Sequence, residues 1–367
     1  MEANVAVLTV DVATGLSEIS GLGSRRRAHI LFMYGDQPIC RREVDIVDGR
    51  ITHSELVMAM KEQDAGPTAP QEAWNAWAAA LLNDHLGAGS ECSKALPPCT
   101  VVICTRDRPS DLRRCLSALC SNVYEDVEVI VVDNDPSDAQ ARLVASEFPV
   151  RYFKERRRGL NWARARGVRL ARHEVILMTD DDVVVRSNWV NEMRQPFLED
   201  HVGAVTGAVE PLELNGGQYL HEQYSSFYRG FKQKRYSLLN CVPPSAGQAG
   251  AGASMGIRRS LAIGLEVFDA ELDAGTAAKS GGDAYALYRI VRAGFTIEFN
   301  PRAIAWHRHR TSQVELENML HGYSVGLYCM LLRALLCDRD PEALLVGLFW
   351  FRPVSYTHLT LPTTERV

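Results

Sequence analysis

Three consecutive aspartates, Asp180, Asp181 and Asp182, follow the apolar run 175–178 and Thr179. Adjacent carboxylates repel one another, and they persist at the end of a strand most easily where a cation neutralises them. Oxygen ligands of this kind suit Mg²⁺ or Mn²⁺, whose remaining positions are filled by water and substrate phosphates. The alternative is a solvated acidic turn ahead of a helix that starts near Ser187. The apolar strand before the turn favours the cation site.

A second polar group, Asp133 and Asn134, follows the apolar run 127–132. An aspartate and an asparagine at this position can hydrogen-bond the base and the ribose of a nucleoside. The same residues also suit an Asx turn and a helix N-cap. Taken alone, the pair leaves both interpretations open.

Positive charge concentrates between residues 151 and 172, where Glu155 is the only opposing charge. Arginine forks match phosphate oxygens, so part of this cluster can face a pyrophosphate. For most of its members a solvated helix face is the better expectation. The cluster consists of Arg151, Lys154, Arg156, Arg157, Arg158, Arg164, Arg166, Arg169 and Arg172.

Two further features lie nearer the C-terminus. Asp283 follows two glycines at the start of a predicted helix that runs to about Arg292, where a carboxylate can be a general base or a helix cap. His307 and His309 follow a short predicted strand, and in an extended segment they share one face. They could reach a metal or a diphosphate, although paired histidines are also common as structural residues.

The elements that must position these residues alternate between apolar strands and helices from Thr100 onward. Such alternation predicts an α/β fold with a parallel sheet and right-handed crossovers. Ligands of these sheets bind beyond the carboxyl ends of the strands, which places Thr105, Arg106, Asp133 and the aspartate turn along one edge. The predicted strands are 100–104, 127–132, 150–153 and 175–178, and the predicted helices are 109–120, a helix from Asp138, and 159–171.

Outside this region the pattern predicts smaller parts. A hairpin of 28–34 and 38–47 and helices at 53–63 and 70–84 indicate a small αβ module over 1–86, without recognisable chemistry, before a linker at 87–99. Residues 100–313 form the main domain, and two amphipathic helices occupy 314–353. Residues 354–367 resemble the translation of a sequencing-adapter read-through, with a genuine disordered tail as the alternative.

Composition narrows the class of protein. The 367 residues are 46% hydrophobic and 23% charged with a net charge of −5, which indicates a globular protein and gives no reason to expect a nucleic-acid partner. Nine cysteines without CxxC spacing are typical of reduced intracellular thiols. The longest apolar runs, 323–337 and 343–351, fall short of the roughly 18–20 residues of a membrane span, and no export signal is visible. We therefore expect a soluble cytoplasmic enzyme, with contact between 314–337, 343–351 and a membrane surface as a weaker expectation.

Taken together, the polar groups and their order resemble the family 2 glycosyltransferases, which have the GT-A fold. The resemblance covers about residues 97–335, and the N-terminal module is similar, less specifically, to an extension found in some bacterial members. The segments that carry it are VVICTRDRP, VIVVDNDPSD, GLNWARARG, MTDDDV followed by Trp189, GAGASMGIRR, AGTAAKSGGD and AWHRHR.

The resemblance implies a role for each matching residue. Asp180 to Asp182 would be the DxD motif, with Asp182 as the main ligand of Mn²⁺ or Mg²⁺ and Asp180 at the ribose or sugar. Asp283 would be the catalytic base and His307 the histidine near the diphosphate and metal. The expected donor-binding residues are Thr105, Arg106, Asp133, Asn134, Arg164, Asp180 and Asp181, and the expected metal ligands are Asp182, Asp180 and His307.

The sequence departs from the family pattern where Asn134 replaces a usual acid, where Gly282 replaces the glutamate before the base, and at Tyr285, where an acid is common. The implied reaction transfers a sugar, with inversion, from a nucleotide-sugar donor, a UDP-sugar for preference, to a hydroxyl of a saccharide or lipid-linked acceptor, as in cell envelope polysaccharide synthesis. One alternative is a catalytically silent sugar-nucleotide-binding protein. Another is a sugar nucleotidyltransferase, which the lack of a glycine-rich phosphate loop after the first strand disfavours.

Overall fold

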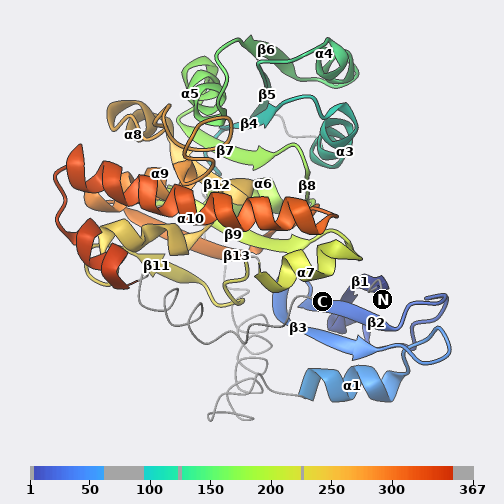
Figure 1. Cartoon of the computed structure of the whole chain (residues 1–367). Helices are drawn as coiled ribbons and strands as arrows, with labels where there is room; N and C mark the ends of the chain where they lie inside the picture. Colours follow the sequence, from blue (N-terminus) through green and yellow to red (C-terminus); the bar gives the residue numbers. More distant parts are fainter. Residues whose placement is uncertain (1–3, 62–94, 123–125, 225–226, 350–367) are drawn as a thin grey trace, which may run out of the picture.

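The computed structural model describes residues 4–61, 95–122, 126–224 and 227–349, and these form two sheets with helices packed on them (Figure 1). The larger sheet has nine strands, eight of them in the order β11-β13-β9-β12-β7-β4-β5-β6. Its parallel half consists of β4 (Cys99–Thr105), β5 (Val127–Asn134), β6 (Arg151–Glu155) and β7 (Val175–Asp180). All four strands predicted from the sequence are confirmed, and each ends one or two residues beyond its apolar run.

The other half of the larger sheet is mixed, and of its strands only the one that leads to His307 was predicted. β12 (Met255–Arg258) runs antiparallel to both β7 and β9 (Val202–Pro211), whereas β9 and β13 (Thr296–His307) are parallel. Two short strands, β8 (Val183–Val185) and β11 (Lys234–Tyr236), pair with β13. The β8 pairing brings the residues that follow Asp182 against His307, which joins two distant parts of the sequence at one edge.

Helices cover both faces of this sheet because its strands are apolar on both sides. Alternate residues of β4 enter different clusters: Val101 and Ile103 pack with the helices α3 and α6, and Val102 packs with α5 and α9. The helices of the main domain are α3 (Pro109–Cys120), α4 (Gln140–Ala145), α5 (Leu160–Leu170), α6 (Trp189–Arg194), α7 (Gly217–Tyr224), α8 (Arg259–Gly264) and α9 (Gly282–Arg292). The predicted helices 109–120, 159–171 and that from Asp138 are thereby confirmed to within two residues.

The N-terminal part forms a second sheet in the order β10-β1-β2-β3, with the helix α1 (His53–Lys61) on one face. The predicted hairpin is present as β2 (Arg27–Tyr34) and β3 (Gln37–Asp45). The strand β1 (Asn4–Asp11) was not predicted, and β10 (Leu214–Asn215) comes from the main domain, so the two parts share a sheet. The predicted helix 70–84 and most of the predicted linker lie outside the described residues, as does the tail 354–367.

The second face of the N-terminal sheet packs on the main domain. Leu31 and Met33 of β2 are buried in one cluster with Ala208 of β9 and with Phe299 and Ile304 of β13. The neighbouring residues of β2 point the other way, toward α1, as the two-residue period of a strand requires. The N-terminal sheet is therefore held by an apolar contact with strands that lead to the aspartate edge.

The helix α10 (Gln313–Leu336) begins at a capping box formed by Ser312 and Glu315 and crosses the main domain in Figure 1. Among the described residues, it is the one helix whose length and composition would suffice to cross a membrane, with 28% of its most apolar stretch buried. The uninterrupted apolar run from Tyr323 is shorter than this helix, so the run alone does not indicate its length. The helix packs on the protein through Met330, Leu331 and Ala334, next to Tyr285 and Tyr288 of α9.

Two glycines of α10 allow it to approach the segment before α9. Ser280 donates a hydrogen bond to the carbonyl of Gly322 (3.0 Å), and a Cβ on Gly326 would lie 2.1 Å from Ser280 Oγ and 2.7 Å from its carbonyl oxygen. Because the obstacle includes backbone, a side chain at Gly326 must displace either α10 or the glycine turn that leads to Asp283.

We predict that Gly326→Ala lowers the free energy of unfolding by about 1–3 kcal/mol, the usual cost of overpacking a close contact. Gly264→Ala, at the end of α8, is the matched control, since a Cβ there meets nothing within 4 Å. It should be neutral or add up to ~1 kcal/mol through helix propensity. Urea denaturation of both variants measures the difference. Equal free energies of unfolding for the two variants would show that α10 is not closely packed at Gly326.

Candidate active site

The three aspartates stand where β7 ends and β8 begins. Asp181 and Asp182 are 4% and 6% exposed, whereas the Asp180 side chain is 33% exposed. Thr105, at the end of the neighbouring strand β4, donates a hydrogen bond from its hydroxyl to Asp181 Oδ2 (2.7 Å). The structure therefore brings Thr105 and the aspartate turn together as the strand order predicts, but Thr105 is buried and holds the turn.

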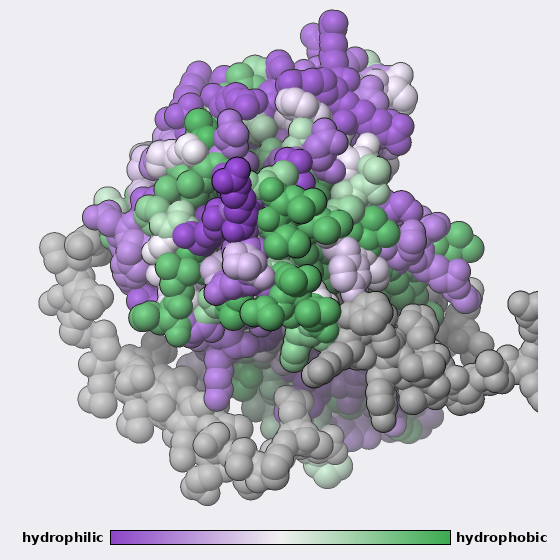
Figure 2. Space-filling view, turned by 60° about the vertical axis from the view of Figure 1, so that its left-hand side comes forward, coloured by the Kyte–Doolittle hydropathy of each residue, from purple (hydrophilic) through white to green (hydrophobic). Residues whose placement is uncertain are grey.

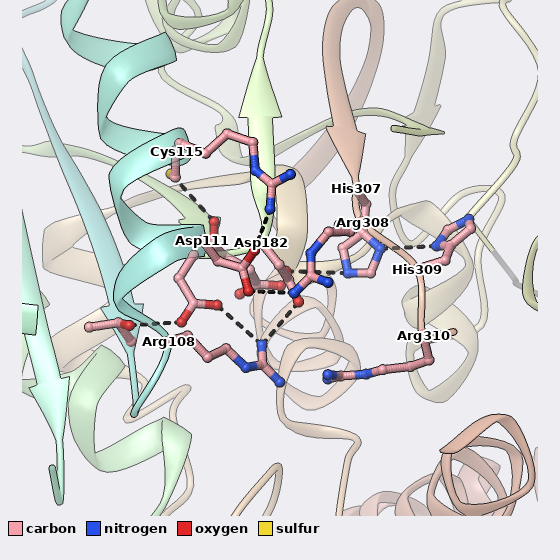
Figure 3. A network of polar contacts seen from close by, with 12 residues as sticks. Arg108, Asp111, Cys115, Asp182, His307, Arg308, His309 and Arg310 are labelled. Carbon is pink, nitrogen blue, oxygen red and sulfur yellow. Dashed lines mark hydrogen bonds and ion pairs between the residues drawn. The ribbon is translucent and has the colours of Figure 1, made fainter. Parts of the chain in front are cut away.

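Two cationic or basic side chains face Asp182 (Figure 3). Nη1 of Arg108 lies 3.0 Å from Asp182 Oδ2 and 3.2 Å from Asp181 Oδ1, and Nε2 of His307 lies 3.4 Å from Asp182 Oδ1. Burial would raise the pKa of Asp182, but His307 and Arg108 outweigh it and keep that pKa below its usual value. Asp182 is therefore the ionised member of the turn.

The other two carboxyl groups, Asp180 and Asp181, are less stable in their charged form than a carboxylate in water. Burial, with the negative charge of Asp182 added, raises the pKa of Asp180 to about 7 and that of Asp181 to about 6. Burial also lowers the pKa of the His307 imidazole to about 4, so its ring is neutral at pH 7. The turn thus has more negative charge than its neighbours neutralise.

This charge and these ligand types fit a divalent cation. Carboxylate oxygens suit Mg²⁺ and Mn²⁺, and a neutral imidazole nitrogen adds a ligand that Mn²⁺ accepts. Within the described part of the chain, no three Asp, Glu, His or Cys side chains already surround a common point. The guanidinium of Arg108 lies between Asp181 and Asp182 instead. Of the predicted ligands Asp180, Asp182 and His307, the last two are adjacent.

Arg164 is an internal ion-pair residue, 4% exposed on α5. It donates to Asp273 Oδ2 (2.6 Å), and its Nη2 lies 3.7 Å from Asp180 Oδ1. A Cβ on Gly252 would lie 2.3 Å from Nη2, so glycine is needed beside the guanidinium. Arg164 therefore fixes Asp180, and its predicted contact with the donor stays a prediction.

Asp283 lies at the N-terminus of α9 and is half-buried. Its Oδ2 accepts a hydrogen bond from the backbone N–H of Gly252 (2.9 Å), which also flanks Arg164. A Cβ on Gly282 would lie 2.4 Å from Asp273 Oδ2 and 2.5 Å from Asn161 Nδ2. The space beside Gly282, where the family resemblance would place a glutamate side chain at this position, is thus filled by the side chains of Asp273 and Asn161.

The predicted nucleoside-binding pair divides into two roles. Asp133 is fully buried, and Tyr152 donates its hydroxyl to Asp133 Oδ2 (2.6 Å), while Oδ1 has no hydrogen-bond partner within the described residues. Asn134 donates to the carbonyl of Arg157 (2.7 Å) and accepts from the N–H of Gly159 (3.0 Å). Its amide therefore braces the loop before α5, which leaves Asp133 as the member with an unused acceptor.

Arg106 and the two histidines complete the predicted set. Arg106 is 37% exposed and reaches Asp135 (3.4 Å) at the edge where Asp133 lies. His307 and His309 share a face as expected, with their Nδ1 atoms 3.1 Å apart. Most of the remaining basic cluster is exposed or paired at the surface, as for Arg157 with Glu155 (2.9 Å).

Sequence reasoning missed three residues that the structure places at this site. Arg108 lies in the segment VVICTRDRP, two residues after Arg106, and this position could have marked it as a site residue. Asp273 lies 109 residues from Arg164 in a loop, where no local pattern marks it. Glu222, on α7, accepts from His309 (2.8 Å), and it too has no local signal.

Known proteins resemble this chain over the same region. Residues 100–261 match the family described as Glycosyl transferase family 2. Polypeptide N-acetylgalactosaminyltransferase 16 of Homo sapiens is 26% identical over 237 residues, 59% of this chain and 41% of that protein. An N-acetylglucosaminyltransferase of Bradyrhizobium diazoefficiens is 22% identical over 245 residues, 62% of this chain and 48% of that protein.

The chain thus spans less than half the length of these two curated relatives. Among solved structures, a mannosyltransferase from Pyrobaculum calidifontis in complex with GDP-Man and Mn²⁺ superposes with a TM-score of 0.49 at 19% identity, covering 73% of this chain and 77% of that one. GalNAc-T7 with UDP, GalNAc and Mn²⁺ gives a TM-score of 0.46 at 17% identity, covering 60% and 45%. Residues 100–261 of this chain are thus similar to the family 2 glycosyltransferases, and they lie within an α/β fold built on the nine-stranded sheet.

Proposed function

We propose that the protein is a metal-dependent, hexosyltransferase-type glycosyltransferase that moves a sugar from a nucleotide-sugar donor to an acceptor hydroxyl with inversion. The observation that carries the proposal is the buried, charge-rich turn Asp180 to Asp182 beside a separate carboxylate, Asp283. Arg164 links the two, because its guanidinium pairs with Asp180 and also feels the charge of Asp283. A cation site and a base at neighbouring positions are what sugar transfer from a diphosphate requires.

The turn would bind the metal and the diphosphate. Asp182 and His307 would hold Mn²⁺ or Mg²⁺, with Asp180 as the further ligand or as the group that contacts the ribose or sugar. The bound cation would neutralise charge on the departing diphosphate, a contribution of several kcal/mol. Arg108, which faces the same carboxylates, carries a positive charge that can serve the same phosphates.

The remaining residues would position the donor and activate the acceptor. The unused oxygen of Asp133 would accept a hydrogen bond from the base, and Asn134 would keep the adjacent loop in place. Asp283 would remove the proton from the acceptor hydroxyl as that oxygen attacks the anomeric carbon. The bond to the nucleotide breaks in the same displacement, which inverts the anomeric centre.

The donor is proposed to be a UDP-sugar and the acceptor a saccharide or lipid-linked glycan of the cell envelope. Two relatives bear the names of N-acetylhexosaminyl transferases, which supports a hexosamine or hexose donor. We place the reaction in the cytoplasm, since the eight cysteines of the described residues are free. Contact with the inner face of a membrane is the further part of the proposal.

Exposed apolar side chains support that membrane contact. Leu332 and Leu336 of α10 are 53% and 70% exposed, and Leu344 and Leu345 of the next helix, at 342–349, are 54% and 67% exposed. Figure 2, which brings the left-hand side of Figure 1 forward, shows hydrophobic residues gathered on the face of the molecule that this view presents. Scattered single leucines are ordinary on a surface, whereas a group on adjoining helices indicates a binding face.

Substitutions at the two carboxylates should separate binding from chemistry. Asp182→Asn should abolish the Mn²⁺-dependent part of UDP affinity, because the diphosphate then faces an acidic turn without its cation. Asp283→Asn should leave that affinity nearly intact and reduce transfer by at least ~100-fold, the lower end for loss of a positioned base. Calorimetric titration of UDP with and without Mn²⁺, beside initial rates of UDP release from UDP-sugars, measures both.

Asp138→Asn is the matched control, since it removes one exposed carboxylate near the same edge of the sheet. Near-normal turnover of Asp283→Asn would make Asp283 a structural residue only. UDP binding by the wild type without any release of UDP from donors would identify a silent sugar-nucleotide binder, and pyrophosphate-dependent formation of UTP would identify a nucleotidyltransferase.

Stabilisation by Mn²⁺ should increase with pH. Because the folded protein raises the pKa of Asp181 to about 6 and that of Asp180 to about 7, these groups favour the fold while protonated, and that contribution is lost as pH rises through those values. A cation must replace their protons. The rise in Tm produced by Mn²⁺ alone should therefore be small near pH ~5 and grow toward pH ~8. A profile that is flat, or that is unchanged in Asp180→Asn, would contradict this.

Flotation with liposomes containing anionic lipid tests the membrane contact. The wild type should rise with the vesicles, and the double variant Leu336→Glu, Leu345→Glu should stay in the soluble fraction, since each substitution places a charge on the apolar face. Leu143→Glu, at a 58% exposed leucine on α4 far from α10 in Figure 1, is the control. Wild type that remains wholly soluble contradicts the proposal.

A further inference from the structure

A chain of polar side chains, buried from Glu222 onward, connects the N-terminal sheet with Asp182. It starts at Arg41 on β3, whose Nη1 donates to Glu222 Oε1 on α7 (2.7 Å). Glu222 Oε2 lies 2.8 Å from His309 Nε2, and His309 Nδ1 lies 3.1 Å from His307 Nδ1. His307 Nε2 then faces Asp182 (Figure 3).

The rings of this chain are fixed by packing. His309 is 1% exposed and stacks on His221 at a centroid distance of 4.2 Å. Phe227 meets the His307 ring edge-on at 5.1 Å. Nδ1 of His221 accepts from the backbone N–H of Arg310, which holds the stacking ring in turn. Neither histidine of the chain can therefore rotate to exchange its two nitrogens without moving its neighbours.

Neutral rings allow two assignments of donors and acceptors along the chain, and each leaves one ring lone pair opposite a carboxylate. The distances favour a hydrogen bond at Glu222, because His309 Nε2 lies 2.8 Å from it, whereas His307 Nε2 lies 3.4 Å from Asp182. The Glu222 carboxylate only accepts, so Nε2 of His309 carries a proton and its Nδ1 does not. His309 Nδ1 must then accept, so Nδ1 of His307 donates to it. The Nε2 lone pair of His307 is left facing Asp182, and a lone pair opposite a carboxylate is favourable when a cation lies between them.

We propose that Glu222 and Arg41 are positioning residues that hold His307 in the tautomer whose Nε2 can bind the cation. The inference rests on the proposed function, because the cation is the one assigned to Asp182. Metal-binding histidines are generally oriented by a partner on the other ring nitrogen, and loss of that partner typically costs about 10–100-fold in metal affinity or activity. The N-terminal sheet, through Arg41, thereby becomes part of the site.

Glu222→Gln tests the assignment because Arg41 only donates hydrogen bonds. Arg41 takes the amide oxygen of the new glutamine, so the NH₂ group faces His309. This change reverses the tautomer of both histidines, so that His307 carries its proton on Nε2, where the cation would bind. Glu43→Gln is the matched control: Glu43 also joins the N-terminal sheet to α7, through Tyr219 (2.9 Å), but it has no contact with the histidines among those the structure shows.

Long-range ¹⁵N–¹H NMR of histidine-labelled, metal-free protein reads the tautomers directly. The wild type and Glu43→Gln should show His307 protonated at Nδ1, and Glu222→Gln should show it protonated at Nε2. The His307 signals are assigned by their loss in His307→Gln. A wild-type ring that carries its proton on Nε2, or on both nitrogens, overturns the proposal without reference to any variant.

Calorimetry of UDP with Mn²⁺ gives the second measurement. Glu222→Gln should weaken the Mn²⁺-dependent affinity by about 10–100-fold at unchanged affinity without metal, and Glu43→Gln should match the wild type. Unchanged affinity in Glu222→Gln, or an equal loss in both variants, overturns the proposal. Wild type without Mn²⁺-dependent UDP binding refutes the proposed function instead, and the NMR result still decides the His307 assignment.

Discussion

The mutual repulsion of three carboxylates at the end of one buried strand is the constraint around which the rest of this structure is arranged. Each neighbouring element contributes a group that offsets part of it: Thr105 from β4, Arg108 from the turn after it, and Arg164 from α5. The offset is incomplete, since burial and the neighbouring carboxylates together keep the pKa values of Asp180 and Asp181 above their usual range. An acidic turn that were only structural would be relieved more cheaply by exposure to water.

The same constraint explains why the site is assembled from segments far apart in sequence. β8 turns back immediately after Asp182 and pairs with β13, which places His307 opposite the turn. Gly252 and Gly282 are small because Arg164 and Asp273 occupy the space beside them. Asp283 is set by the same packing, through the N–H of Gly252 and the contact of α10 with the turn before it. The position of Asp283 therefore depends on the ion pairs that hold Asp180.

The parts that could be predicted from the sequence are those governed by local pattern. The four parallel strands and the helices after them follow from apolar runs and their spacing, and so does the gathering of Thr105, Asp133 and the aspartates at one edge. Apart from the strand before His307, the mixed half of the sheet could not be predicted, because β12 and β8 are short and take their direction from partners rather than from their own residues. Likewise Asp273 and Glu222 are single carboxylates in unremarkable surroundings, and only the fold brings them to Arg164 and His309.

The N-terminal sheet shows how such long-range placement gives meaning to a segment without a motif. Its apolar contact, Leu31 and Met33 against β9 and β13, would suffice to dock it. Burying Arg41 and Glu222 in the same interface adds a desolvation cost that an apolar pair would avoid. Because a buried ion pair adds little to stability, the Arg41–Glu222 pair is better explained by the side chains that it orients. Here that is a histidine pair ending at Asp182, which ties the N-terminal sheet to the chemistry of the aspartate turn.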